Sequence, residues 1–477
     1  MDLRSQAAQL VDRVIANNLW RQRRCFNLIP SENTPSLLVK MMEISDPAGR
    51  YAEHRTMKGK EIYFYQGIDF IRDVEEECRR AIGEYFQAPR AELRPVSGQM
   101  ANEIVFKAVT AHVNRGRKDG EPWRRIRAVM NNDLTKGGHL SSQPMGALFN
   151  YVDFGADGKE RVVNFPIRKD NPYKIDTDAL GALLSEVRPE LIVFGKSMFI
   201  YREPVEFVAK IVKDWDPRPV IMYDMAHVLG LYGAFQAPLA EGADLVTGST
   251  HKTFFGPQRG VVVGTLPEGH PHAKLWLQIK SRAFPGSTSN HHLGTLLALL
   301  MATHEMNAFK AEYQEQVRRN AKAWARALAA AGLDVQGDPA DGYTETHQVL
   351  LRVSQHGPAE EVARRLEENN LVCNYQALPD DATFLESSGL RTGVAEMTRF
   401  GMREEDFGPL AQFFADCVAR QKRVADEVSA YREKFMTMGY CLPVEEAAPM
   451  AARILRSIFP REEYAQRFAE NLEALGR

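Results

Sequence analysis

Short runs of apolar residues, many of them β-branched, recur through the middle of the chain and alternate with helical patterns. The clearest runs are RAVM (127–130), LIVFG (191–195), PVIMYD (219–224), DLVTG (244–248) and GVVVG (260–264). Runs that are apolar at nearly every position are typical of strands buried on both faces, as in a parallel sheet covered by helices. This region is therefore predicted to form a mostly parallel α/β sheet.

The pattern changes in the last third of the chain. A long helical stretch at 296–333 comes first, and a strand at 349–353 and a helix at 359–370 follow. After about residue 404 the chain is amphipathic with a helical period, and no fixed-period repeat is present. We predict three parts: an N-terminal arm at 1–35, a large α/β domain at 36–310 and a smaller α+β domain at 311–477.

Composition excludes several classes of protein. The 477 residues include 60 Lys+Arg and 62 Asp+Glu, so the net charge of -2 lacks the basic excess of a nucleic-acid-binding surface. The longest apolar run, 296–302, is far shorter than the roughly 20 residues of a membrane helix, and the polar start lacks the apolar core of a signal peptide. The five cysteines are scattered without metal-ligand spacing, which is typical of free thiols. We expect a soluble cytoplasmic enzyme with no metal and no nucleic-acid or membrane partner.

Two charged residues follow predicted strands. Lys252 stands in GSTHKTFFGPQRG (248–260), and Asp224 ends PVIMYD. A lysine desolvated beside a buried strand has a lowered pKa and can attack an aldehyde, whereas most lysines are solvated. Asp224 is either a helix N-cap or an acid that pairs with a cation. Because α/β folds bind ligands at the carboxyl ends of strands, this acid and this lysine are the pair that a pyridoxal phosphate site requires.

The segment SGQM (97–100) precedes a helical stretch at 101–113. Small residues at a helix start leave backbone N–H groups at the positive end of the helix dipole, which suits a phosphate group. The same residues also form ordinary N-caps. The position of this segment ahead of Asp224 and Lys252 in one predicted domain favours a phosphate site.

Eight motifs then occur in order along the chain. They are SENTPS (31–36), RYAE (50–53), SGQMAN (97–102), GGHL (137–140), DMAH (224–227), THKTFFGPQRG (250–260), FPG (284–286) and SGLRTG (388–393). Together they resemble the serine hydroxymethyltransferase family over about residues 28–401. The resemblance implies an α/β fold of the fold-type I, aspartate-aminotransferase-like class, with a large mostly parallel-sheet domain, a smaller C-terminal α+β domain and pyridoxal phosphate as cofactor.

The resemblance also assigns residues to the cofactor. Lys252 matches the Schiff-base lysine, Asp224 the partner of the pyridine nitrogen and His139 the histidine stacked on the ring. His227, also expected in catalysis, and Ser197 match contacts near the phenolic oxygen. The other matches are Ser97 and Gly98 for the phosphate, with Gln99, His251, Tyr51 and Gly286. The last two match groups from a neighbouring subunit, so the resemblance implies a homodimer with a shared active site, or a tetramer.

Four further residues match substrate-binding and proton-transfer positions. Arg391 matches the arginine that holds the amino-acid carboxylate, a task that suits a bidentate guanidinium. Ser31 and Tyr65 match additional substrate contacts. Glu53 matches the acid–base glutamate beside the substrate hydroxyl and folate, and a carboxyl with a perturbed pKa in a closed cleft can move that proton. Glu53 is thus expected to act in catalysis together with Lys252.

The matches to a tetrahydrofolate site are partial. They are Leu134, Gly138, Leu140, Phe64 and Gln376. Phe64 stands where the family has a tyrosine, and Gln376 stands where it has an asparagine. The segment HRTMKGKEIYFYQG (54–67) is longer than the family's counterpart, and Ser287 replaces a glycine. At the positions that match a tetrahydrofolate site, this chain therefore has the family's residue type at some positions and a different residue type at others.

These departures leave two enzymatic hypotheses for an amino-acid substrate. In the first, the protein interconverts serine, or an α-substituted serine, and a glycine-type amino acid by Cα–Cβ cleavage, with the one-carbon unit passed to tetrahydrofolate. In the second, it is a folate-independent threonine aldolase or transaldolase that uses an aldehyde and makes β-hydroxy-α-amino acids. Glu53 favours the first, because hydroxymethyl chemistry uses an acid there. A third hypothesis is an inactive family member that acts as a binding protein.

Overall fold

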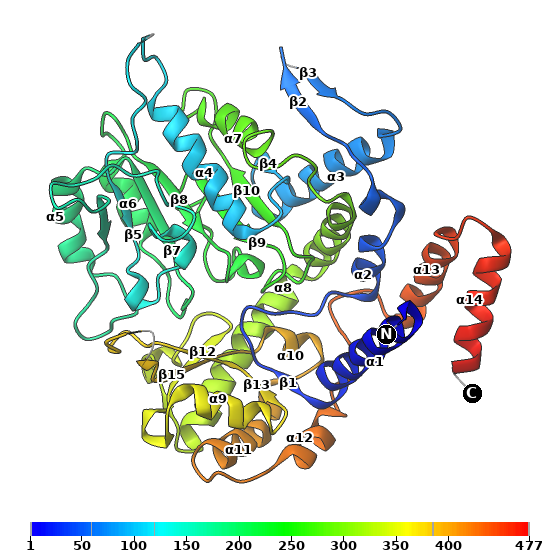
Figure 1. The fold of residues 1–477 in the computed structure, drawn as a ribbon. Coiled ribbons are helices and arrows are strands. Elements are labelled where there is room, and N and C mark those ends of the chain that lie inside the picture. The colour runs from blue at the N-terminus through cyan, green and yellow to red at the C-terminus, as the bar shows by residue number, and fades with distance from the viewer. Residues whose placement is uncertain (1, 59, 119, 384–385, 476–477) are drawn as a thin grey trace.

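A seven-stranded sheet forms the centre of the larger part of the molecule (Figure 1). The computed structural model describes residues 2–58, 60–118, 120–383 and 386–475. The strand order is β4-β10-β9-β8-β7-β5-β6; neighbours from β6 to β9 are parallel, and β10 is antiparallel to β9 and β4. The strands are β4 (Arg90–Glu92), β5 (Val129–Asn131), β6 (Val162–Asn164), β7 (Leu191–Gly195), β8 (Val220–Asp224), β9 (Leu245–Ser249) and β10 (Gly260–Gly264).

Both faces of this sheet are buried, as the uninterrupted apolar runs predict. Along β8, Ile221 and Tyr223 belong to one hydrophobic cluster, while Val220 and Met222 belong to another. Since side chains alternate between the faces of a strand, the two clusters are the cores on the two sides. The surrounding helices are α3 (Asp69–Phe86), α4 (Gly98–Val113), α5 (Thr177–Val187), α6 (Val205–Val212) and α7 (Leu275–Ala283). The predicted mostly parallel α/β sheet is confirmed.

The smaller part contains a four-stranded antiparallel sheet of order β11-β12-β15-β14. Its strands are β11 (Asp334–Val335), β12 (Gln348–Arg352), β14 (Asn374–Gln376) and β15 (Gly389–Gly393). Its helices are α9 (Ala359–Glu367), α10 (Ala395–Arg399), α11 (Phe407–Val418) and α12 (Ala425–Arg432). The strand expected at 349–353 is thus β12, shifted by one residue.

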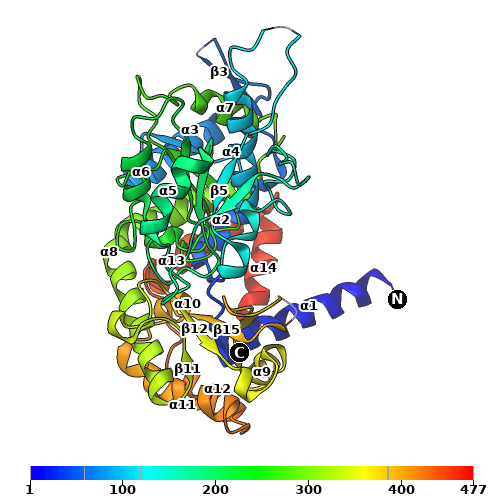
Figure 2. The same ribbon diagram turned by 90° about the vertical axis from the view of Figure 1, so that its left-hand side faces the viewer.

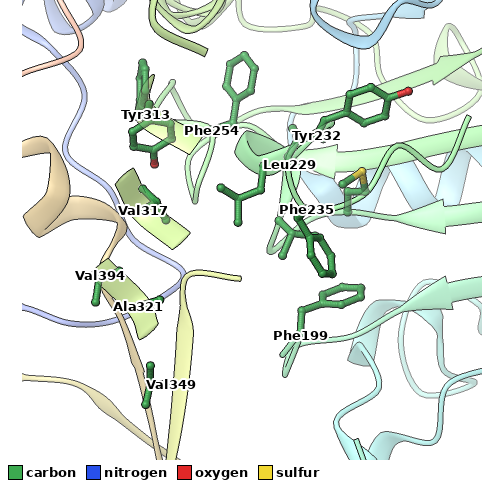
Figure 3. Close-up of a cluster of buried hydrophobic side chains, with 14 of the residues drawn as sticks. Phe199, Leu229, Tyr232, Phe235, Phe254, Tyr313, Val317, Ala321, Val349 and Val394 are labelled. Carbon is green, nitrogen blue, oxygen red and sulfur yellow. The ribbon is translucent and has the colours of Figure 1, made fainter. Parts of the chain in front are cut away.

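The long helix α8 (Leu293–Ala330) connects the two parts. It packs on α3 in the larger part and on α11 and β11 in the smaller part. Figure 3 shows part of the core at this junction, where Tyr313, Val317 and Ala321 of α8 belong to one cluster with side chains of the larger part, such as Phe199, and of the smaller part, such as Val349. The boundary predicted after residue 310 falls inside α8, and the division into domains stays a prediction.

The two ends of the chain add helices outside these sheets. The helix α1 (Leu3–Leu19) has no buried residue and extends from the body, as Figure 2 shows. The strand β1 (Phe26–Asn27) pairs in parallel with β13 (Leu371–Val372), so residues of the predicted arm join the smaller part. The remaining helices are α2 (Leu37–Glu43), α13 (Val444–Ser457) and α14 (Glu462–Leu475). Within the described ranges, no helix is both long and apolar enough to cross a bilayer.

The longer segment after Glu53 folds as an antiparallel hairpin. Its strands, β2 (His54–Met57) and β3 (Lys60–Tyr63), pair from His54 with Tyr63 to Met57 with Lys60. The backbone N–H of Phe64 donates to the carbonyl oxygen of Glu53 at 3.0 Å and closes the base. The hairpin stands at the edge of the larger part, beside α3 (Figure 1).

Candidate active site

Asp224 lies at the carboxyl end of β8, where it is buried. Its Oδ2 accepts a hydrogen bond from Nδ2 of Asn102 at 2.8 Å and lies 2.5 Å from Nδ1 of His139; its Oδ1 accepts from the backbone N–H of Ala226 at 2.9 Å. Burial alone would raise the pKa of Asp224, but His139 and these hydrogen bonds outweigh it and hold the pKa below its ordinary value. Asp224 is therefore an oriented anion at neutral pH.

Asn102 and Thr247 form a second layer around this carboxylate. Asn102, fully buried on α4, accepts from Oγ1 of Thr247 at 2.5 Å and donates to Oγ of Ser141 at 2.8 Å as well as to Asp224. Thr247 is paired with Asp224 across β8 and β9. Sequence reasoning assigned neither residue to the site. The available signal was a polar side chain inside an otherwise apolar, buried element.

Lys252 follows β9 and reaches the same edge of the sheet. Its Nζ lies 3.1 Å from Nε2 of His227. Burial lowers the pKa of Lys252 to about 8; Asp224 opposes this effect, and Arg391 adds to it. Near neutral pH a useful fraction of this amine is therefore unprotonated, which is the form that attacks a carbonyl carbon.

Besides His227, two further histidines, His139 and His347, lie in this part of the site. The rings of His139 and His227 meet edge to face, with centroids 5.2 Å apart. Burial, reinforced by Lys252 and Arg391, holds the pKa of His227 well below its ordinary value, so its neutral ring can accept a hydrogen bond from the amine. His347, which sequence reasoning missed, is fully buried, and its Nε2 lies 2.9 Å from the carbonyl oxygen of Pro30. Burial lowers its pKa to about 3, so it too is neutral.

Arg391 extends from β15, in the smaller part, toward the same place and is 8% exposed. Its Nη1 donates to the carbonyl oxygen of Ser197 at 2.8 Å, and its Nε donates to Oδ1 of Asn374 at 3.2 Å. In the part of the chain that the structure describes, no carboxylate forms an ion pair with it. Burial lowers the pKa of Arg391 to about 10, so it remains a cation at neutral pH. Because a buried, unpaired cation is costly, an anionic ligand would be bound strongly there.

The start of α4 approaches the site with little steric bulk. Ser97 caps the helix by accepting from the backbone N–H of Met100 at 3.1 Å. A Cβ on Gly98 would lie 2.1 Å from Oγ of Ser249, and a Cβ on Gly260 would lie 2.1 Å from the carbonyl oxygen of Ser97, so both positions require glycine. The first turn carries no acidic residue. The positive end of the helix dipole is therefore available to a phosphate group.

Comparison with known proteins agrees with this geometry. The model of the family described as serine hydroxymethyltransferase matches residues 4–414. The serine hydroxymethyltransferase of Staphylothermus marinus is 36% identical over 440 residues, covering 91% of this chain and 92% of that protein. That of Methanothermobacter thermautotrophicus is 37% identical over 435 residues, covering 90% and 94%. The crystal structure of L-threonine transaldolase from Pseudomonas fluorescens in its internal aldimine state has a TM-score of 0.79 and 25% identity, covering 94% of this chain and 98% of that chain.

This chain belongs to the serine hydroxymethyltransferase family. It is an enzyme, a pyridoxal-phosphate-dependent transferase of fold type I, so the predicted family, fold class and pyridoxal phosphate cofactor are confirmed, while the use of tetrahydrofolate stays a prediction. Its substrates are small molecules. The hypothesis of an inactive binding protein is thereby set aside.

The residues at the sheet edge fit the cofactor of this family. Lys252 supplies an amine of lowered pKa, Asp224 supplies an oriented anion for a protonated pyridine nitrogen, and the start of α4 supplies a cradle for phosphate. Of the other expected cofactor contacts, Ser197 is held through its carbonyl oxygen by Arg391, and Gln99 is exposed beside Gly98. Burial lowers the pKa of His251 to about 4. The assignments of individual residues stay predictions.

Three of the expected site residues between 51 and 65, namely Tyr51, Phe64 and Tyr65, form a separate, exposed group, and Glu53 between them is partly buried. Tyr51, Phe64 and Tyr65 are 50%, 51% and 39% exposed. The rings of Tyr51 and Tyr65 lie 5.2 Å apart, and the ring of Phe64 lies 6.4 Å from that of Phe284. Slight desolvation and the Glu53 carboxylate, which the Tyr65 hydroxyl contacts, raise the pKa of Tyr65. These large aromatic side chains thus lie at the surface of the described chain.

The remaining expected residues lie in loops and at strand ends. Ser31 follows Pro30, whose carbonyl oxygen contacts His347, and the carbonyl oxygen of Gly286 accepts from Lys107 at 3.0 Å. The expected folate contacts are Leu134 in a 3-10 turn, Gly138 in the next loop, Leu140 at 51% exposure, Gln376 at the end of β14, and Phe64. No group of His, Cys, Asp and Glu among the described residues is arranged to hold a metal ion.

Proposed function

We propose that the protein is a hydroxymethyltransferase that interconverts serine, or an α-substituted serine, and a glycine-type amino acid, with tetrahydrofolate as the one-carbon carrier. The observation that most supports this proposal is that Arg391, from β15, lies near Lys252 and Asp224 at the carboxyl edge of the large sheet. An amine of lowered pKa, an oriented carboxylate and an unpaired buried guanidinium are what a cofactor-dependent enzyme acting on α-amino acids needs.

Each of these residues has a proposed task. Arg391 binds the amino-acid carboxylate and orients the substrate, which fixes the Cα–Cβ bond relative to the ring plane. Lys252 would hold pyridoxal phosphate, with His139 against the ring, Ser97 and Gly98 at the phosphate, and Asp224 at the pyridine nitrogen. When bound, that cofactor supplies a protonated ring that accepts the electrons of the breaking bond. Asn102 and Thr247 keep Asp224 in place.

Proton transfer at the substrate hydroxyl needs another acid. Asp224 is the one carboxylate that affects the pKa of Lys252 among the described residues, and it is already engaged by His139 and Asn102. It is therefore poorly placed to exchange a proton with substrate. We assign proton transfer at the substrate hydroxyl to Glu53, whose carboxylate contacts the hydroxyl of Tyr65.

The exposure of Tyr51 and Tyr65 supports delivery of Glu53 to the site of a second copy of the chain. We therefore propose a homodimer whose active sites are shared between subunits, with a tetramer as a further possible assembly. The α1 helix, without any buried residue, is a further surface that a second copy can cover. The five cysteines are free thiols, which supports a cytoplasmic location.

The second candidate is a folate-independent threonine aldolase or transaldolase. Two observations favour it: a solved structure similar to this chain is an L-threonine transaldolase, and the residues matched to folate depart in type at Phe64 and Gln376. The same Lys252, Asp224 and Arg391 would serve both reactions, because both break the Cα–Cβ bond of an amino acid. The relatives named serine hydroxymethyltransferase and the retained Glu53 support the first candidate.

One experiment separates the candidates. Purified holoenzyme is incubated with serine, threonine or α-methylserine, each with and without tetrahydrofolate, and the amino-acid products are quantified. The proposed function requires formation of glycine or alanine that depends strictly on tetrahydrofolate. Turnover of threonine with an added aldehyde and no folate would select the second candidate. A holoenzyme that is inert toward all three would refute both.

A further inference from the structure

The β2–β3 hairpin is anchored by a buried cluster of charged and aromatic side chains that the proposed reaction does not use. At its centre Glu75 of α3 is fully buried, with Oε1 2.8 Å from Nε2 of His291 and Oε2 3.5 Å from Nε2 of His54. Tyr63 donates its hydroxyl to Oε2 of Glu75 at 3.2 Å, and Arg79 lies 3.5 Å from the same oxygen. His54 and Tyr63 are the first and last residues of the hairpin, so the cluster holds its base.

His54 is the residue that ties this cluster to the backbone before the hairpin. It is 1% exposed, and its ring stacks on that of Tyr63 with centroids 4.4 Å apart. Its Nδ1 lies 3.1 Å from the carbonyl oxygen of Ala52. Because a carbonyl oxygen only accepts, Nδ1 donates to it. The other nitrogen, Nε2, lies 3.4 Å from Nη2 of Arg79 and 3.5 Å from Oε2 of Glu75.

Two more contacts fix the hairpin to neighbouring elements. Arg94, ion-paired to Glu92, donates from Nη1 to the carbonyl oxygen of His54 at 3.2 Å. Glu61 of β3 accepts from Nζ of Lys280 on α7 at 2.9 Å. The hairpin thus contacts α3, α7 and the residues that follow β4.

The geometry points to His54 as a positioning residue for Glu53 and Tyr65. Glu53 lies between Ala52 and His54, the two residues joined by the imidazole, and its carbonyl oxygen accepts from the N–H of Phe64. Glu53 directly precedes β2 and Tyr65 follows β3, so the two residues flank the anchored base of the hairpin. Their side chains contact each other there. This inference rests on the proposed function, in which Glu53 of one copy enters the active site of another.

The test compares His54→Phe with His54→Asn in the full-length holoenzyme. His54→Phe keeps the ring stacked on Tyr63 but loses both nitrogen contacts, whereas His54→Asn can place an N–H near the carbonyl oxygen of Ala52. We expect His54→Phe to lower kcat for amino-acid cleavage about 100-fold, since a small displacement of an acid costs about that much. KM and the cofactor absorbance stay within twofold of wild type, and His54→Asn recovers most of the loss. The exposed hairpin variant Arg55→Ala is the control and keeps wild-type kcat.

A double variant separates this inference from the proposed role of Glu53. If His54 acts through Glu53, adding His54→Phe to Glu53→Gln lowers kcat no further. Additive losses, or a His54→Phe enzyme with wild-type kcat, would overturn the inference. If Glu53→Gln alone has no effect, the role of Glu53 in the proposed function is wrong instead. Should His54→Phe not yield folded holoenzyme, His54→Gln, which withdraws from Ala52 but can reach Arg79, takes its place with the same expected loss in kcat.

Discussion

The sheet edge around Lys252 and the hairpin region around Glu53 differ in nearly every physical respect. The sheet edge is buried, is built from both parts of one chain, and has its charges oriented by hydrogen bonds from Asn102 and Ala226. The hairpin region presents exposed aromatic rings at Tyr51 and Phe64. Burial is what shifts pKa values and leaves a cation unpaired, so we place the cofactor chemistry in the buried region. In the proposed homodimer, the exposed region acts only when it meets a second copy of the chain.

The largest expected effect concerns the buried region. Lys252→Ala should lower turnover of any amino-acid substrate by about 10⁴-fold or more, because the proposed covalent attachment of the cofactor is lost. Absorbance spectra before and after borohydride treatment check cofactor attachment, and a kinetic assay checks turnover. Lys213→Ala, at an exposed position, is the matched control. A Lys252→Ala enzyme with wild-type turnover would remove this residue from the mechanism.

The next prediction concerns the exposed region. Glu53→Gln should lower serine cleavage by about 10²–10³-fold, the usual contribution of a general acid or base, while the cofactor stays bound. The exposed Glu84→Gln on α3 is the control. Mixing the inactive Lys252→Ala and Glu53→Gln proteins under subunit exchange should restore activity to roughly a quarter of wild type, because one site of each mixed dimer is intact. Absence of recovery, with mixed dimers demonstrated, would contradict a shared active site.

Arg391 should give a smaller effect that appears in substrate binding. Arg391→Ala should raise KM for the amino acid on the order of 100-fold, because the carboxylate loses charge-assisted hydrogen bonds at a buried site. Steady-state kinetics measure the change. Arg352→Ala, on the neighbouring strand β12 and partly exposed, is the control. An unchanged KM would show that another group binds the carboxylate.

The smallest expected effect is a shift in pH dependence. The rate at which apoenzyme attaches pyridoxal phosphate should rise with pH to a midpoint near 8, because the Lys252 amine must be unprotonated and its pKa is lowered to about 8. Asp224 raises this pKa and Arg391 lowers it. Asp224→Asn should therefore move the midpoint down, and Arg391→Ala should move it up. Stopped-flow absorbance across pH measures both, and a midpoint unchanged in both variants would contradict the electrostatic interaction.

Much of the buried region could be predicted from the sequence. Runs such as LIVFG and GVVVG appear as β7 and β10 with the predicted bounds, because strands buried on both faces carry an unmistakable apolar pattern. The motifs around Asp224 and Lys252 also placed both residues at carboxyl ends of strands, where the structure has them. Such local patterns suffice when the neighbours in space are strands of one sheet.

Other features depend on contacts between distant segments. The pairing of β1 with β13, the approach of Arg391 to Ser197, and the enclosure of His347 beside Pro30 join residues far apart in the chain. The hydrogen bonds of Asn102 to Asp224 and Thr247 cross from helix to sheet. No local pattern indicates such contacts, because they depend on how elements pack.

The sequence by itself therefore determined the α/β class, the family and the types of residue available for chemistry, since periodicity and motifs are local properties. Only the tertiary structure decided which of those residues share a buried, low-dielectric site, and burial is what shifts the Lys252 pKa and leaves the Arg391 charge unpaired. It also decided that β2 and β3 pair as a hairpin anchored by His54 and Glu75. Burial and unpaired charge are properties of packing, which a linear sequence carries only indirectly.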